Sequence, residues 1–506
     1  MSGRAEFMAV LRDVVEDYFG WREACLGGAA DPGGPGFPGG PDAGALVREL
    51  SKRLARESTP WPSPLYLAHM TGDTPPAVAL AYLCALLYNP NNVAEESSPV
   101  TTELEREVGE DLCRLVGYDP ATGWAHLASG GHAASYEAVW IARNLRALPL
   151  AAAADPAARD LVAGIPRVSL ANLPVPRILD LLDALAARGV RPARRGGGTL
   201  LFARNAHQTW RKCADLLGVA AEEVETDEHH RMDLRDLRRR VVDLVGRGRP
   251  VVAVVATVGS TGEGSVDDLA GVIRLREWCE RRYGASFYVH ADAAFGGYYR
   301  SLCLGDEPPQ EEILKPHVRE AFAALPLADS VTVDPHKTGC VPYPAGGLAL
   351  RDRRASAVVA TRSGYFREAT PAGHYTLEGA RPGAAAAAVW AAHRLIGLHA
   401  RGYGRLLGGC LDTARRLHRR FPAPGGLVSA YDPDLTIVNL AGGQKVVGRA
   451  LAALRADGRL WVSANGPAVR LCVMKELDPP RLDHVCRLLR EAARACGPPV
   501  PGSTPR

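Results

Sequence analysis

One lysine stands in a sequence context that could support covalent chemistry. Lys337 follows a short β-branched run at residues 330–333 and precedes a turn rich in glycine and proline. This pattern is typical of a buried strand that ends in a loop, which predicts a lysine inside a cleft. Burial should lower its pKa toward the neutral amine, and a neutral amine can form a Schiff base with an aldehyde. The alternative interpretation, which the motif alone favours, is a lysine on a surface turn.

A glycine-rich turn upstream could bind an anion. Ser129 is followed by Gly130, Gly131 and His132, and a helical pattern begins there. The first turn of a helix offers free backbone N–H groups and the positive end of the helix dipole, and glycine lets a ligand approach closely. We therefore expect a phosphate-binding turn, although a Gly-Gly pair by itself is more often an ordinary turn.

Three further polar residues each follow a predicted strand. His207 could lie flat on an aromatic ring, and the hydroxyl-rich turn at Thr261 could orient a carboxylate or hold a phosphate. Asp292 would be costly to bury without a cationic partner, and a protonated pyridine nitrogen would supply one. Each residue also has a plain structural explanation: a satisfied core histidine, a strand-to-loop turn and a helix cap.

Composition narrows the class of protein. The 506 residues are 47% hydrophobic and 23% charged, with a formal net charge of +4, which argues against nucleic acid as the main partner. Eleven cysteines are scattered without metal-ligand spacing, so we expect no metal site and reduced thiols in a cytoplasm. The charged, helix-like N-terminus does not look like a secretory leader, and no apolar run is long enough to cross a membrane.

The alternation of elements predicts an α/β fold. Short strands at 199–203, 251–258, 286–290 and 330–333 are separated by helical stretches, which favours a mainly parallel sheet covered by helices. The predicted domains are an N-terminal helical segment at 1–118, a large domain at 119–395 and a smaller C-terminal α+β domain at 396–506. A Gly/Pro-rich linker is expected at 27–43.

Residues 101–105 are expected to open a helix. Thr101 or Thr102, followed by Glu105, has the spacing of an N-terminal capping box.

Taken together, these motifs match the needs of pyridoxal phosphate (PLP): an anchor for its phosphate, a partner for its ring and an amine for its aldehyde. The sequence resembles the PLP-dependent group II amino-acid decarboxylases, and within them the bacterial tyrosine decarboxylases. The resemblance rests on Asp334-Pro-His-Lys-Thr-Gly339 and on further matching segments, which are 63–70, 88–93, 98–105, 341–346 and 375–379. It implies the type I, aminotransferase-like fold.

The resemblance also implies roles for individual residues. Lys337 would bind the cofactor covalently, Asp292 would pair with the pyridinium nitrogen, and His207 would stack on the ring. Thr261 would hold the Asp292 carboxylate or the cofactor. Tyr343 is the candidate proton donor to the substrate α carbon. Other residues that the resemblance places at the cofactor are Gly130, Gly131, His132, Ala294 and His336. Tyr343, Tyr365 and Tyr375 remain alternatives for the tyrosine that closes over the substrate.

The sequence departs from the family pattern in places that bear on the substrate. The phosphate turn carries His132, Ala133 and Ser135 where the family usually has threonine, glutamate or a similar residue, and asparagine, respectively. Asp292 is followed by alanines where tryptophan or tyrosine is common, and we expect a C-terminal region shorter than that of tyrosine decarboxylases. Backbone N–H contacts to a phosphate would survive these changes, so the substrate pocket is the part most affected.

The resemblance favours α-decarboxylation of an L-amino acid to its amine and CO₂. An aromatic substrate such as tyrosine, or an aliphatic one such as valine or leucine, is expected, because no cationic site for a distal carboxylate stands out. Transamination and O₂-dependent oxidative deamination are alternatives with a carbonyl product, and a non-catalytic relative would fail to bind PLP. The family implies a homodimer with active sites at the interface.

Overall fold

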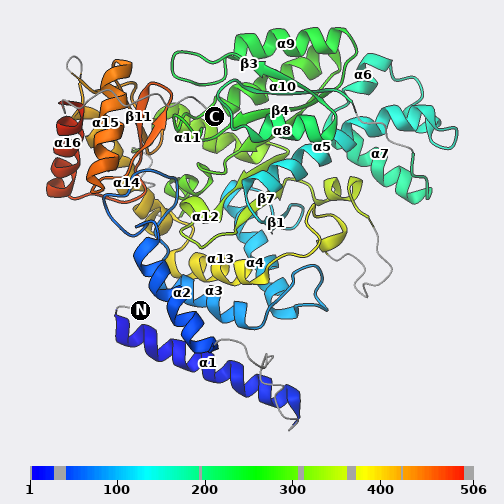
Figure 1. Cartoon of the computed structure of the whole chain (residues 1–506). Coiled ribbons are helices and arrows are strands. Elements are labelled where there is room, and N and C mark those ends of the chain that lie inside the picture. The colour runs from blue at the N-terminus through cyan, green and yellow to red at the C-terminus, as the bar shows by residue number, and fades with distance from the viewer. Residues whose placement is uncertain are drawn as a thin grey trace.

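The computed structural model describes residues 3–27, 42–192, 197–305, 313–361, 372–422 and 426–494. Its centre is a seven-stranded sheet (Figure 1). In spatial order the strands are β1 (Trp124–Ala128), β7 (Gly346–Leu350), β6 (Ser330–Val333), β5 (Tyr288–Asp292), β4 (Val251–Thr257), β2 (Thr199–Ala203) and β3 (Ala220–Val224).

The sheet is mainly parallel, as the sequence predicts. Strands β3, β2, β4, β5 and β6 pair in parallel, whereas β7 runs antiparallel to both β6 and β1. Every residue of β2, β4 and β5 is buried, which explains their continuous apolar runs, since a parallel strand is covered on both faces. The observed β5 extends to Asp292, two residues beyond the predicted strand, so this aspartate belongs to the strand itself.

Helices cover the sheet in two groups. Helix α5 (Gly131–Ala154) contacts strands β1, β7, β6, β5 and β4, and α7 (Val175–Ala187) and α8 (Thr209–Leu217) pack against it. Helix α10 (Leu269–Tyr283) packs on β4 and β5 beside α9 (Leu234–Gly246) and α11 (Pro316–Ala324). This arrangement confirms the predicted α/β architecture.

The C-terminal part forms a second layer with its own core. A four-stranded antiparallel sheet contains β8 (Val428–Ser429), β9 (Ile437–Ala441), β10 (Ser463–Asn465) and β11 (Ala468–Cys472). It lies with α14 (Arg405–Arg419), α15 (Gln444–Asp457) and α16 (Pro479–Arg494) at one side of the molecule (Figure 1). Leu67, far away in sequence, joins this core and pairs with Trp461 and Cys472. The division of the chain into domains at 118 and 395 stays a prediction.

The N-terminal helices differ in how they pack. Helices α3 (Pro76–Leu87) and α4 (Pro99–Val116) pack against α13 (Gly383–Ile396), beside the sheet. Helices α1 (Arg4–Leu26) and α2 (Ala43–Glu57) bury no residue and lie at the edge of the molecule (Figure 1). No helix in the described ranges is long and apolar enough to span a membrane. The predicted linker lies, over residues 28–41, outside the described residues.

The predicted capping box is wrong. Helix α4 begins at Pro99, before the threonines, and Glu105 points into the interior. There Glu105 forms an ion pair with Arg381, whose side chain is 4% exposed, and also accepts the Leu127 N–H at 3.0 Å and the Asn92 amide at 2.8 Å. The carboxylate therefore joins three segments from across the chain, a role that local spacing cannot reveal.

We expect Glu105→Ala to destabilise the protein by about 3–5 kcal/mol, because it leaves the Arg381 charge buried and unpaired. Urea denaturation followed by circular dichroism would measure the loss. Glu103→Ala is the matched control: Glu103 lies on the same helix with its side chain 68% exposed, and its loss should change stability by about 0.5 kcal/mol or less. Equal midpoints for the two variants would contradict this assignment.

Candidate active site

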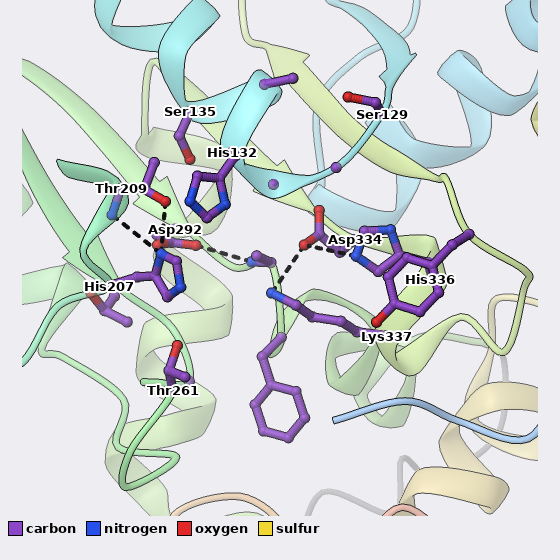
Figure 2. A pocket seen from close by; sticks show the side chains of 18 residues that line it. Ser129, His132, Ser135, His207, Thr209, Thr261, Asp292, Asp334, His336 and Lys337 are labelled. Carbon is purple, nitrogen blue, oxygen red and sulfur yellow. Dashed lines mark hydrogen bonds and ion pairs between the residues drawn. The ribbon is translucent and has the colours of Figure 1, made fainter. Parts of the chain in front are cut away.

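The predicted site residues come together around one cavity of about 340 Å³. They reach it from the carboxyl ends of β1, β2, β4, β5 and β6, which meet at the same edge of the sheet. Figure 2 shows the labelled side chains around this space. Its lining includes each residue that the sequence singled out for catalysis or cofactor binding: Gly130, Gly131, His132, His207, Thr261, Asp292, Ala294, His336, Lys337 and Tyr343.

Lys337 lies on the single turn α12 (Pro335–Thr338), directly after β6. Its Nζ is 3.0 Å from Oδ2 of Asp334, a side chain that is 1% exposed. Burial would lower the pKa of Lys337, but Asp334 and Asp292 outweigh it and raise the pKa above the ordinary value of a lysine. The prediction that burial leaves a neutral amine is therefore wrong for this arrangement, because two carboxylates act on the same amine.

Asp292, the last residue of β5, carries a buried carboxylate on the cavity wall. It accepts the indole N–H of Trp210 at 3.2 Å and the backbone N–H of Ala294 at 3.3 Å. Burial raises the pKa of Asp292, although Lys337 opposes the shift. Thr261 is not among the hydrogen-bond partners of this carboxylate in the described structure. A cationic group in the cavity would stabilise Asp292 as the anion.

His207 is held in one orientation. Its Nδ1 accepts the backbone N–H of Thr209 at 3.3 Å and lies 2.7 Å from the Thr209 hydroxyl, which leaves the ring proton on Nε2. Burial, with help from His132 and Lys337, lowers the pKa of His207 to about 4. The ring is therefore neutral at physiological pH. His132 meets it edge to face, with ring centroids 4.9 Å apart.

The glycine turn is shaped for close approach. Gly130 is the N-cap of α5, and no side chain caps this end of the helix. A Cβ on Gly131 would lie 2.6 Å from Asp334 Oδ2, and one on Gly346 would lie 2.4 Å from the backbone of Gly130. The backbone N–H groups that open α5 can therefore face an anion with no side chain between them.

The hydroxyl-rich turn is positioned by a carboxylate. Glu263 accepts hydrogen bonds from Ser260 at 3.0 Å, from Asn205 at 3.1 Å and from Asn465 of β10 at 3.1 Å. Thr261 lines the cavity from this turn. The C-terminal sheet thereby fixes one wall of the site.

Tyr343 borders the cavity from the loop after Lys337. Its hydroxyl lies 3.1 Å from the Thr71 hydroxyl, and its ring lies against His336 with centroids 4.2 Å apart. The side chain is 55% exposed, so it can contact a ligand that enters. Tyr375 instead packs on Trp124 and does not line the cavity, and Tyr365 lies outside the described residues.

The sequence interpretation assigned no role to three residues of the site. Asp334 stands three residues before Lys337 in the same motif, and the i, i+3 spacing is a signal that could have identified it. Trp210 and Thr209 follow His207 directly and look like ordinary helix residues. Only the folded arrangement shows that they hold Asp292 and His207.

Comparison with known proteins identifies the family. A model of the pyridoxal-dependent decarboxylase conserved domain matches residues 199–424. The L-tyrosine decarboxylase of Levilactobacillus brevis is 35% identical over 489 residues, which cover 85% of this chain and 76% of the relative. The chain belongs to the pyridoxal-dependent decarboxylases.

A more distant relative agrees with this decarboxylase assignment, and a solved structure agrees with the fold. The L-aspartate decarboxylase of Thermococcus kodakarensis is 26% identical over 461 residues, covering 90% of this chain and 99% of the relative. The structure of Oryza sativa TDC with PLP and tryptamine has a TM-score of 0.68, 17% identity and 97% coverage of both chains. The structural match confirms the type I fold, and the matched family model confirms the pyridoxal cofactor that the sequence implied. The protein is a PLP-dependent amino-acid decarboxylase.

The cavity of this decarboxylase fits the cofactor. The uncapped start of α5 suits a phosphate, and Asp292 offers a buried negative charge to a protonated ring nitrogen. Two buried polar atoms of the lining, Thr257 Oγ1 and Asp334 Oδ1, have no hydrogen-bond partner among the described residues.

We expect Gly131→Ala to weaken PLP binding by at least about tenfold, because the added methyl group displaces the Asp334 carboxylate or the turn. Fluorescence titration of the cofactor-free protein with PLP would measure the dissociation constant. Gly448→Ala on α15, where a Cβ meets nothing within 4 Å, should bind PLP like the wild type. Unchanged affinity in Gly131→Ala would show that the turn tolerates a side chain.

Proposed function

We propose that this decarboxylase removes the α-carboxylate of an aromatic L-amino acid of the tyrosine type, releasing the amine and CO₂. The observation that carries the proposal is the meeting of Lys337, Asp292, His207 and the start of α5 around one cavity. Bound PLP supplies an electron sink for the bonding pair that remains on the α carbon when CO₂ leaves.

The side chains of this site divide the work. Lys337 attaches the cofactor, and the start of α5 with Gly130, Gly131 and His132 binds its phosphate. Asp292, oriented by Trp210, keeps the ring nitrogen protonated.

The other lining residues orient the ring and supply the proton. Neutral His207 lies on one face of the ring, with Ala294 and His336 in contact with the cofactor. Of its two expected roles, Thr261 holds the cofactor, because it lines the cavity and its hydroxyl does not hydrogen-bond to Asp292. Tyr343 delivers the proton to the α carbon.

Two observations favour a tyrosine-like substrate over an acidic one. The relative at 35% identity acts on L-tyrosine, whereas the aspartate decarboxylase is 26% identical. Among the described residues that line the cavity there is no arginine, and its one lysine is Lys337, which the cofactor engages. A distal carboxylate would therefore lack a cationic partner, and burying it unpaired would be costly. The aliphatic substrates valine and leucine are the runner-up.

The proposal can be tested by measuring how fast the PLP-loaded protein releases CO₂ from each of the twenty L-amino acids. We expect tyrosine to be the best substrate and aspartate to react at least about a hundredfold more slowly in kcat/KM, which corresponds to one missing ion pair. Lys337→Ala should abolish turnover. Preferred release from aspartate would contradict the substrate assignment, and a carbonyl product without CO₂ would contradict the reaction.

We expect Tyr343→Phe to lower kcat by about 10²–10⁴-fold, because it removes the proton donor while leaving the ring on His336. The dissociation constant of PLP should change by less than about threefold, since the hydroxyl contacts Thr71 rather than the cofactor-binding turn. Tyr375→Phe, which alters a tyrosine outside the cavity, is the control and should keep wild-type kcat. The reverse pattern would assign the proton to Tyr375.

The proposal extends to assembly and location. Helix α2 exposes an apolar stripe of Leu46, Leu50 and Leu54, each more than half exposed, and α1 exposes Phe19 and Trp21. Exposed apolar stripes of this kind are typical of protein interfaces, which supports a homodimer that joins these helices. The family resemblance alone suggests that the active sites lie near the dimer interface. The buried residues Cys113, Cys213 and Cys279 are free thiols, which supports a reducing compartment such as the cytoplasm.

We expect the double variant Leu46→Glu/Leu50→Glu to be monomeric, because two carboxylates would be buried in the apolar contact. Light scattering should give about twice the 53.9 kDa chain mass for the wild type and one chain mass for the variant. Lys52→Glu, an exposed polar position on the same helix, should stay dimeric. A monomeric wild type would contradict the proposed assembly.

A further inference from the structure

We infer that Asp334 is a positioning residue that holds Lys337 as an ammonium ion in the cofactor-free protein, and that this contact controls the pH at which the protein captures PLP. The inference rests on the proposed role of Lys337 as the attachment point. In this role Asp334 acts in cofactor loading rather than in turnover.

Asp334 lies at the junction of several parts of the site. Its Oδ2 is 3.0 Å from Lys337 Nζ and 3.6 Å from His336 Nε2, and its backbone N–H donates to Ala294 at 3.1 Å. Its Oδ1 is buried and has no hydrogen-bond partner in the described structure. The carboxylate also fills the space beside Gly131 at the start of α5. The Asp334 side chain thus lies beside Lys337, His336 and the glycine turn that opens α5 (Figure 2).

The charges around Lys337 favour its protonated form. Asp334 on its own motif and Asp292 at the end of β5 are the carboxylates that act on it, and both raise its pKa against the effect of burial. His132 of α5 and His207 also face the cavity, but burial lowers the pKa of both imidazoles, so they add no positive charge at neutral pH. His336 is likewise held neutral by burial, and the nearby Tyr343 hydroxyl raises the pKa of Lys337 further.

An ammonium group cannot capture an aldehyde. The Nζ atom must first lose a proton to solvent; it then forms the C–N bond, and the carbonyl oxygen leaves as water. Each pH unit below the pKa of the lysine therefore slows capture about tenfold. The ion pair with Asp334 sets how much neutral amine is present.

Asp334 has a second partner when the lysine moves. The Nδ1 atom of His336 accepts the Ala345 N–H at 3.2 Å, so the ring proton of neutral His336 sits on Nε2, which faces Asp334. The ring is fixed between this bond and Tyr343. When Lys337 binds the aldehyde, the His336 N–H can donate to the carboxylate, which is then not left buried and unpaired.

The inference can be tested by measuring how fast the cofactor-free protein captures PLP between pH 6 and pH 9. The visible absorption of the bound cofactor reports the rate. For the wild type we expect a steep rise with pH. Asp334→Asn keeps the side-chain size and removes the charge, so capture at pH 6.5 should be at least about tenfold faster than in the wild type, with a shallower pH profile. Asp111→Asn, which removes a carboxylate paired with Arg394 outside the cavity, should follow the wild type.

Two outcomes would overturn the inference. Superimposable profiles for Asp334→Asn and the wild type would show that the carboxylate does not control the lysine. A gain of equal size at every pH would show that Asp334 only repels the phosphate. The ratio of the Asp334→Asn rate to the wild-type rate at each pH removes the effect of the titration of PLP itself, which is the same for both proteins.

A measurement on the wild-type chain keeps the inference testable if Asp334→Asn fails to fold. Reductive methylation of the cofactor-free protein with formaldehyde, read by mass spectrometry between pH 7 and pH 11, reports the protonation of each lysine. Lys337 should become reactive at the same pH as the exposed Lys52 and Lys445 or higher. Reactivity that begins one pH unit or more below theirs would overturn the inference. A Lys337→Ala protein that still gives the bound-cofactor band would instead refute the proposed function.

Discussion

The whole site depends on one constraint, which is that parallel strands bring their carboxyl ends to the same edge of a sheet. Strands β1, β2, β4, β5 and β6 point the same way, so the segments that follow them surround one space. Every residue of β2, β4, β5 and β6 is buried, because these strands are covered on both faces. Gly131 and Lys337 are far apart in sequence, but both lie beside the Asp334 carboxylate in the folded protein.

Electrostatics then decide what the space can bind. The described lining of the cavity contains two buried carboxylates, Asp292 and Asp334, and one fixed cation, Lys337. The nearby imidazoles are neutral and add no positive charge. The cavity of the cofactor-free protein is therefore short of positive charge at Asp292 and rich in N–H donors at the start of α5. A ligand with a protonated ring nitrogen at one end and a phosphate at the other matches this polarity, as PLP does.

Much of this architecture could be predicted from sequence because it follows from local patterns. Apolar β-branched runs predicted β2, β4, β5 and β6 but not β1, β3 and β7 of the seven-stranded sheet. The polar residues after the predicted strands indicated which side chains would line the cavity. What could not be predicted depends on long-range packing. Glu105 has the spacing of a cap but pairs with Arg381, and Lys337 is surrounded by carboxylates that reverse the effect of burial on its pKa. Asp292 accepts a hydrogen bond from Trp210 rather than from Thr261. The turn that carries Thr261 is instead held by Glu263, which accepts a hydrogen bond from Ser260.

Every role assigned to the site requires that Lys337 is the residue that attaches the cofactor. Borohydride reduction of the PLP-loaded protein, followed by proteolysis and mass spectrometry, would locate the attachment directly. We predict one modified peptide, which contains residues 334–339 and carries the reduced pyridoxyl group on Lys337. Modification of a different lysine, or of none, would contradict the account.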